Sequence, residues 1–401
     1  MPDAGIFPFC TGSIVFGEEN AVAFFRALQS LFRKQPTLPL PGEGERPDYR
    51  DTLSVISDLS RLVRNDPEAV DVYLALGNLF RAQGDIERAV LIRESLIARS
   101  NLNVRFTARA YFELGQDYHR AGVVDRALSS FREAARLGHN QNAVTAELAE
   151  LFASAGDFEQ AAEEYGKLNH SLAQAHYLVL RSRELSDAGN ASKAERFLKR
   201  ALRIYPESIE AWSAHLRMAI LGKSSRKTCA HLERALVRVA PNLRFLLLDA
   251  ILESLHMISG TNGTDILTQK VEAEVDPFVR EVVGQIIPIL EKQEPHILVH
   301  YYGALLLQQA GDCDEMDIWL AKALVVQPNF WAARLQSLAL SVQQHELPPV
   351  VSLQVHYLTE ELKYIRRFTC TVCGFRENRI FYRCRRCGSW HSLAFRISLQ
   401  Q

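Results

Sequence analysis

The sequence has almost no excess of charge of either sign. Its 46 lysines and arginines face 47 aspartates and glutamates, which gives a formal net charge of −1. The chain as a whole therefore lacks the basic surplus that is typical of nucleic-acid-binding proteins. Hydrophobic residues make up 47% of its 401 positions, which is enough for a sizeable core divided over two or more structural units.

Long hydrophobic runs are also missing. A membrane-spanning helix needs about 20 predominantly apolar residues, and the N-terminal apolar run is short and broken by Pro8 and Gly12. That run also lacks the basic start of a signal peptide. The apolar run from Phe245 to Leu252 contains Asp249, which favours a buried helix. We therefore expect a chain without a membrane-spanning helix.

Motifs that mark common catalytic sites are absent. The sequence contains no GxSxG, no HExxH and no Walker-type phosphate-binding loop. Its helical histidines are dispersed: His119, His176, His215, His231 and His300. An isolated histidine on a helix is usually a surface residue or a satisfied core residue. The sequence thus predicts a protein that is not an enzyme and has no catalytic or cofactor-binding residues.

A repeat of about 34 residues determines the expected fold. Four alanines, each five residues after a glycine, follow one another at spacings of 38, 34 and 33 residues: Ala89, Ala127, Ala161 and Ala194. In the first unit an apolar stripe with helical spacing precedes Gly84, where the first helix has to end. This pattern is typical of tetratricopeptide repeats. We expect an all-α, right-handed superhelix of seven to nine helical pairs, followed by a small zinc-ribbon or rubredoxin-like module.

Changes in composition divide the chain into four parts. Residues 1–50 hold an amphipathic segment, Ala21 to Phe32, and a proline- and glycine-rich linker, Gln35 to Pro47. The repeat array is expected at 51–347, a connecting segment at 348–363 and the metal-binding module at 364–401. Stacked repeats leave a concave groove, lined by the first helix of each pair. The groove residues that we expect to contact a partner are Asn78, Arg81, Gln116, His119 and Arg120.

The seven cysteines do not suggest a disulfide framework, and this usage suits the reducing cytoplasm. Four of them form the pattern C-x2-C-x10-C-x2-C: Cys370, Cys373, Cys384 and Cys387. Two such turns supply four thiolates, enough to close a tetrahedral metal site with no position left for a substrate. The pattern therefore predicts a structural metal. Thiolates favour zinc in a cytoplasmic protein, and iron in a rubredoxin-like redox site is the alternative.

The C-terminal module is locally basic, with eight arginines between positions 366 and 396 and Glu377 as its only acid. Some of these arginines can offset the charge of a zinc tetrathiolate. Others can bind a protein, an anionic lipid surface or nucleic acid, with nucleic acid the least favoured of the three. The residues of the module that we expect to contact a partner are Arg383, Arg385, Arg386 and Trp390.

Two segments together resemble the lipopolysaccharide assembly protein B family of Gram-negative bacteria. They are YLALGNLFRAQGDIERA (Tyr73 to Ala89) and FTCTVCGFRENRIFYRCRRCGSW (Phe368 to Trp390). The resemblance implies a cytoplasmic adaptor that presents the lipid A deacetylase to a membrane-bound AAA protease, with the four cysteines as metal ligands. The family has an N-terminal transmembrane helix, and from the apolar content of residues 1–50 we expect none in this sequence. We therefore expect peripheral association with the inner membrane, through a partner or through the Ala21–Phe32 segment.

Three functions remain open on the sequence alone. The first is a non-enzymatic adaptor that binds a protein client, alone or as an oligomer. The second is a nucleic-acid-associated factor that binds through its arginine-rich ribbon, and the third is an iron-binding electron-transfer protein. The sequence favours the adaptor, because it pairs an extended repeat surface with a closed metal site.

Overall fold

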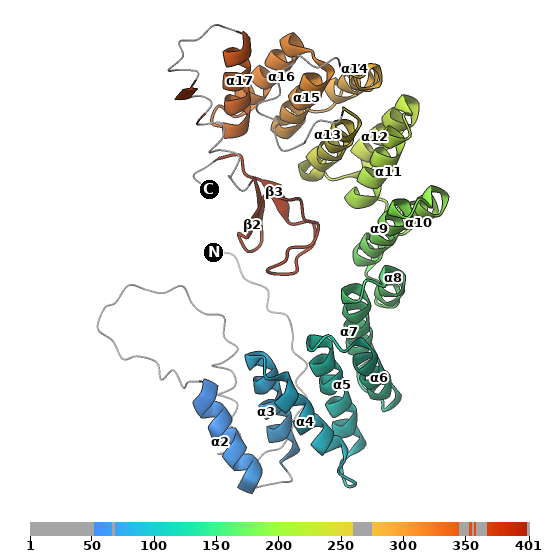
Figure 1. The fold of residues 1–401 in the computed structure, drawn as a ribbon, viewed down its shortest axis with the longest axis vertical. Helices are drawn as coiled ribbons and strands as arrows, with labels where there is room; N and C mark the ends of the chain where they lie inside the picture. The colour runs from blue at the N-terminus through green and yellow to red at the C-terminus, as the bar shows by residue number, and fades with distance from the viewer. Residues whose placement is uncertain are drawn as a thin grey trace, which may run out of the picture. The chain divides into compact units, whose positions relative to one another are not determined.

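The computed structural model describes residues 52–65, 69–259, 275–344, 353–354, 357 and 367–398. In these residues sixteen α-helices are followed by three short β-strands (Figure 1). The helices are α2 (Thr52–Asn65), α3 (Val70–Gln83), α4 (Ile86–Ile97), α5 (Val104–Arg120), α6 (Val124–Arg136), α7 (Gln141–Ser154), α8 (Phe158–Lys167), α9 (Ser171–Asp187), α10 (Ala191–Ile204), α11 (Ile209–Leu221), α12 (Ser225–Arg238), α13 (Phe245–Ser259), α14 (Pro277–Glu291), α15 (Ile297–Ala310), α16 (Cys313–Val326) and α17 (Trp331–Gln344). The all-α expectation is confirmed. The amphipathic segment 21–32, the linker 35–47 and most of the connecting segment 348–363 lie outside the described residues.

Residues Ile56–Gln401 form one compact unit. In this unit the helices from α3 to α12 pack two by two, and α15 packs on α16 in the same way. The first helix of a pair also contacts the first helix of a neighbouring pair: α3 with α5, α5 with α7, α9 with α11, α11 with α13, and α13 with α15. This is the stacking that the 34-residue period predicts. The odd-numbered helices consequently line one side of the array.

The turn between the two helices of a unit follows from its glycine. Gly84 has a φ of 85°, in the left-handed region that glycine adopts without strain. Its N–H donates to the carbonyl of Arg81, and the next residue, Asp85, caps α4 by accepting a hydrogen bond from the backbone N–H of Arg88. Gly311 and Asp312 repeat this arrangement between α15 and α16.

The glycine within the first helix of a unit allows the second helix to approach closely. A Cβ atom on Gly115 would lie 2.6 Å from the ring of Phe131, which follows sixteen positions later. Gly303 has the same relation to Trp319, also sixteen positions later. Phe131 and Trp319 are both fully buried. Each large side chain therefore fills the space that a missing side chain leaves open, which fixes the distance between the paired helices.

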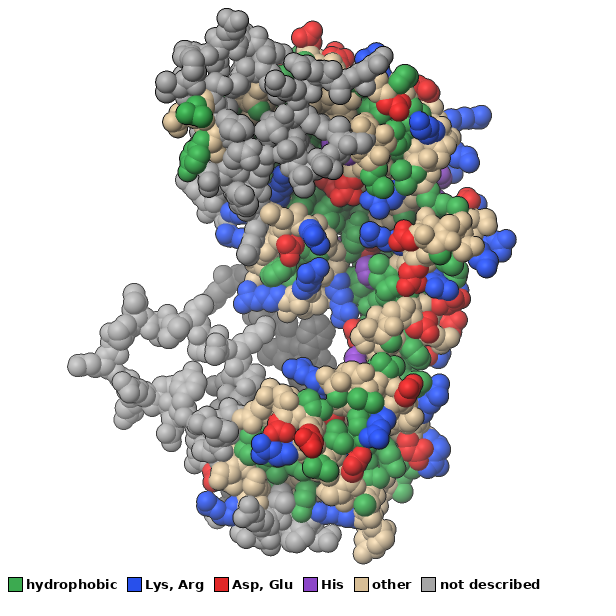
Figure 2. All heavy atoms as spheres, in the orientation of Figure 1, with side chains coloured by type: hydrophobic (Ala, Val, Ile, Leu, Met, Phe, Trp, Pro, Cys, Tyr) green, Lys and Arg blue, Asp and Glu red, His purple; other side chains and the backbone are tan. Residues whose placement is uncertain are grey.

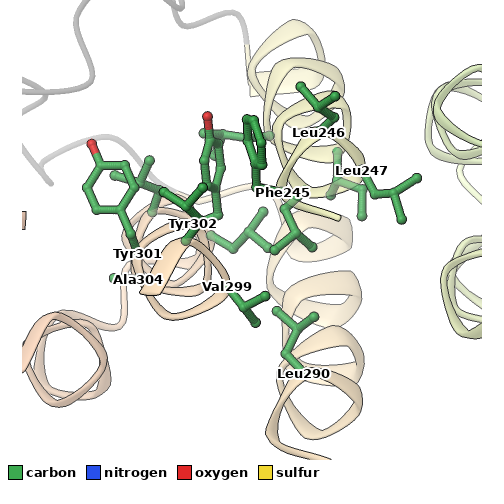
Figure 3. Close-up of a cluster of buried hydrophobic side chains, with 14 of the residues drawn as sticks. Phe245, Leu246, Leu247, Leu290, Val299, Tyr301, Tyr302 and Ala304 are labelled. Carbon is green, nitrogen blue, oxygen red and sulfur yellow. The ribbon is translucent and has the colours of Figure 1, made fainter. Parts of the chain in front are cut away.

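The C-terminal module is a three-stranded antiparallel sheet in the order β2-β1-β3: β1 (Phe368–Cys370), β2 (Arg376–Glu377) and β3 (Leu393–Phe395). Its hydrophobic side chains join the core of the repeats. The ring of Phe395 lies 5.7 Å from Phe330 and 6.3 Å from Phe245 of α13, centroid to centroid. Figure 3 shows part of this core, where Phe245 lies beside Tyr302 of α15. The module is thus packed on the array and has no separate core.

Candidate metal centre

Two backbone turns with the same geometry position the four cysteines. In the first turn the N–H of Gly374 donates to the carbonyl of Cys370 at 2.9 Å, and in the second the N–H of Gly388 donates to Cys384 at the same distance. Both glycines have a φ near 70°, which a residue with a side chain rarely adopts. The CxxCG sequence therefore folds locally into a tight turn that presents two sulfur atoms to one point.

The four sulfur atoms come together as the spacing predicts. They all lie within 4.8 Å of one another, and this is the one such group of potential metal ligands among the residues that the structure describes. The Sγ atoms of Cys370 and Cys387 are 3.7 Å apart, as are those of Cys373 and Cys384. A tetrahedral ion with sulfur ligands at about 2.3 Å would separate the sulfurs by about 3.8 Å. The four cysteines could therefore hold a metal ion.

Two serines next to the second turn surround the sulfur of Cys370. The hydroxyl of Ser392 lies 3.2 Å from this sulfur, and that of Ser389 lies 3.5 Å from it and 2.9 Å from the sulfur of Cys387. Burial alone would raise the pKa of Cys370, but the two hydroxyl hydrogen bonds and nearby backbone amides lower it to about 5. These hydrogen bonds thus favour the thiolate of Cys370, the form that binds metal. At Cys373 the backbone N–H of Phe375 lowers the pKa, but burial and the neighbouring cysteines raise it to about 12. The sequence analysis missed both serines, although Ser389 directly follows the CxxCG turn.

A buried carboxylate joins the metal-binding module to the array. Oε1 of Glu210, on α11, lies 3.1 Å from Nε2 of His391 in the module and 3.3 Å from Nδ1 of His176 on α9. Burial would raise the pKa of Glu210, but the hydrogen bonds from the two imidazoles lower it to about 2. The carboxylate is therefore ionised and links three separate parts of the chain.

Arg383 and Trp390 make a second junction with the array. The guanidinium of Arg383 contacts both carboxylate oxygens of Glu150 on α7, at 2.7 and 3.0 Å, and stacks over Trp390 at 5.3 Å. The Trp390 ring meets the ring of His176 edge to face at 4.9 Å. Trp390 thus packs on α9, in the middle of the array. Both residues were expected to contact a partner, and the structure places them against the same chain.

The five expected groove residues lie in different environments. Asn78 and Arg81 are half-buried, Gln116 donates to Glu147 at 2.6 Å, and Nε2 of His119 lies 3.0 Å from the hydroxyl of Ser154. Arg120 is exposed, as are Arg385 and Arg386 of the module. For a partner, the most accessible of the predicted residues are therefore the three exposed arginines.

Asn78 and Arg81 belong to a polar network that the sequence analysis did not foresee. At its centre lies Arg93, fully buried at the position that Phe131 and Trp319 occupy in other units. Arg93 donates to the carbonyl of Leu74 and to the side chain of Asn78. Both Arg93 and Arg81 also pair with Glu113 and Asp117 of α5. Two arginines thus face two carboxylates between neighbouring units, and this balance lets the charges be buried.

A cleft of about 740 Å³ opens between α14, α15 and α16. Most of its lining is apolar, with Leu290, Ile318 and Val325 among its residues, and Lys322 lies 3.7 Å from Glu291 at its border. The lining also includes the ionisable side chains of His300 and Asp317.

Comparison with known proteins gives a short match and no family model. The chain is 36% identical over 72 residues to the proteins called lipopolysaccharide assembly protein B of Escherichia coli K12 and of Escherichia coli O157:H7. The match covers 18% of this chain and 18% of each relative, so the chain matches these curated relatives over about a fifth of their length. No model of a protein family matches.

Solved structures of two tetratricopeptide-repeat proteins are also similar. One, from Parabacteroides merdae, is 14% identical, with 68% of this chain and 98% of that chain covered and a TM-score of 0.33. The other, described as having an unusual peptide-binding site, is 14% identical, with 70% and 97% covered and a TM-score of 0.21. In the part of the chain that the structure describes, no helix is long and apolar enough to cross a membrane. The 72-residue match and the four-cysteine cluster fit the resemblance to the lipopolysaccharide assembly protein B family.

Proposed function

We propose that the protein is a non-enzymatic adaptor, in which the repeat array binds a protein client and a zinc ion stabilises the C-terminal module. The observation that carries the proposal is the pairing of a helix-pair array with a closed four-sulfur site. Four protein ligands leave a metal no open position for chemistry. Stacked helix pairs, in turn, offer a long surface for a peptide or a folded partner.

The position of the module supports one region of the array for client binding. Contacts of the module reach α7, α9, α11 and α13 on the side lined by odd-numbered helices. A client would therefore use α3, α5 and the exposed side of the module. The name of the curated relatives suggests a client in lipopolysaccharide assembly. More specifically, the client would be the lipid A deacetylase, presented to a membrane-bound AAA protease by a cytoplasmic adaptor held peripherally at the inner membrane.

The experiment that tests this function is capture of the client by the full chain from a Gram-negative host. We expect the wild-type chain to retain one or a few specific proteins, the deacetylase and the protease among them. A variant with Cys370→Ser and Cys373→Ser should lose them together with its metal. If the wild-type chain retains no specific protein, the adaptor function is wrong.

Iron is the alternative to zinc at the same four sulfurs. Hydrogen bonds to the sulfur atoms, such as those from Ser389 and Ser392, are one means by which proteins tune the potential of an iron centre. Metal analysis of the purified chain separates the two cases. About one zinc per chain with no visible colour supports the adaptor, whereas stoichiometric iron with a reversible red chromophore supports electron transfer.

A further inference from the structure

We infer that the second cysteine turn and the end of α5 form one basic surface that binds an acidic peptide segment of the client. The surface, called here the α5–knuckle surface, consists of Arg120, Arg385 and Arg386. This inference rests on the proposed adaptor function and names the chemistry of the partner.

The charge of the module supports a basic binding surface. Residues 367–398 contain seven arginines and one acid, Glu377. A zinc ion with four thiolates would add two negative charges, and the pair with Glu150 neutralises Arg383. About three positive charges then remain, so the arginines exceed what the metal site itself requires. Figure 2 shows the result, with basic side chains spread over the module and few acidic ones among them.

Arg385 and Arg386 are two of the four exposed arginines in the described part of the module, with Arg376 and Arg379. They lie between Cys384 and Cys387, at the tip of the second turn, and no ion pair or hydrogen bond occupies either side chain within the described residues. Arg383 and Arg396, in contrast, are held by Glu150 and by burial. The two tip arginines are therefore available to a ligand.

Helix α7 contacts both the residue before the second cysteine turn and the end of α5. Arg383, one residue before the second turn, contacts Glu150 of α7. His119 contacts Ser154. Ser154 lies four residues after Glu150 and so one turn further along the same face of α7, which places the Cβ atoms of these two residues about 6 Å apart. The C-terminal part of α7 thus contacts both Arg383, which precedes the second cysteine turn, and His119 at the end of α5. Arg120 follows His119 and is exposed.

An extended acidic peptide fits these groups best. Guanidinium groups bind carboxylates through two parallel hydrogen bonds. Because the two arginines are exposed, the protein without its ligand does not have to bury their charges. The neighbouring carboxylate of Glu150 is already neutralised by Arg383 and does not repel an acidic ligand.

The test uses the full chain with its metal and a fluorescent twelve-residue peptide rich in aspartate and glutamate. Anisotropy is measured for the wild type, R385E/R386E, R120E and the control K193E/R196E. The control makes the same change in net charge on α10, where both side chains are exposed. Metal content and circular dichroism establish that each variant is folded. A phosphatidylserine vesicle and a single-stranded oligonucleotide are the competing probes.

We expect R385E/R386E to weaken peptide binding by at least about tenfold, R120E by about threefold and K193E/R196E by less than about twofold. Binding should also weaken as salt rises, because the surface is exposed. Three results would overturn the inference: no peptide binding at about 0.1 M salt, equal loss in the control variant, or tighter binding of the vesicle or the oligonucleotide.

Client capture with the same variants separates this inference from the proposed function. If R385E/R386E retains the client as well as the wild type does, the adaptor function stands and the α5–knuckle surface is not its binding site. If the wild type captures no client, the adaptor function itself fails, whatever the peptide result.

Discussion

His391 and Glu210, 181 residues apart in the sequence, meet at 3.1 Å between an imidazole nitrogen and a buried carboxylate oxygen. The same oxygen also contacts His176. One carboxylate thereby ties the metal-binding module to two helices in the middle of the array. The stability of the whole compact unit should depend on its charge.

Glu210→Gln should lower the free energy of unfolding at pH 7 and flatten its dependence on pH. The pKa of Glu210 is about 2 in the folded protein against an ordinary value of 4.5. A depressed pKa means that the stabilisation is fully present above about pH 4.5 and is lost as the pH falls toward 2. Its size is about 3 kcal/mol. Urea denaturation from pH 7 down to pH 2 measures it.

The control for this charge is the exposed Glu163 of α8. Glu163→Gln should leave both the stability at pH 7 and its decline in acid within about 0.5 kcal/mol of the wild type. An E210Q variant whose acid decline matched that of the wild type would show that Glu210 is not the group responsible.

Arg383→Ala should loosen the module without releasing the metal. The variant removes a bidentate pair with Glu150 and the stacking over Trp390, at a cost of about 1–2 kcal/mol. Hydrogen exchange of the module amides should become faster, while metal content stays unchanged. Arg383→Lys keeps the charge but loses the planar guanidinium. The exchange rate of the module amides in this variant should therefore lie between those of the wild type and the alanine variant.

Removal of the metal should destabilise part of the array as well as the module. Phe368 and Phe395 flank the cysteine turns and share a core with Phe245 of α13 and Tyr302 of α15. Chelation, or Cys370→Ser, should therefore increase hydrogen exchange in α13 and α15 while α3 to α6 remain protected. Cys313→Ser, at a cysteine outside the metal cluster, is the control and should retain the metal. Faster exchange limited to the module would contradict the shared core.

Gly115→Ala should destabilise the protein by about 1–3 kcal/mol, because the new methyl group would collide with the ring of Phe131. Adding Phe131→Leu should restore part of that loss by making room. Gly284 of α14 is a matched control: a Cβ there meets no other atom. Gly284→Ala should be neutral or stabilise by up to about 1 kcal/mol. Thermal denaturation of the wild type and these three variants distinguishes steric collision from helix propensity.

The local features of the fold could be predicted from the sequence because neighbouring residues produce them. The position of Gly84 ends α3, and each CxxCG turn brings two sulfurs together within five residues. Repetition then extended the local pattern to the whole array. One signal went unused: alignment of the repeats places Arg93 where Phe131 stands in the next unit, and this substitution alone indicates a buried polar network around Asn78 and Arg81.

The sequence by itself determined the helix pairs, the turn glycines and the four-cysteine site, since these depend on short spacings and on the steric demands of single residues. Only the tertiary structure decided where the module lies and which arginines stay exposed. Arg383 and Glu150 are 233 positions apart, and no periodicity links them. Their pairing depends on the stacking of every unit between them. That stacking gives Arg383 and Trp390 contacts within the chain and leaves Arg385 and Arg386 open to solvent.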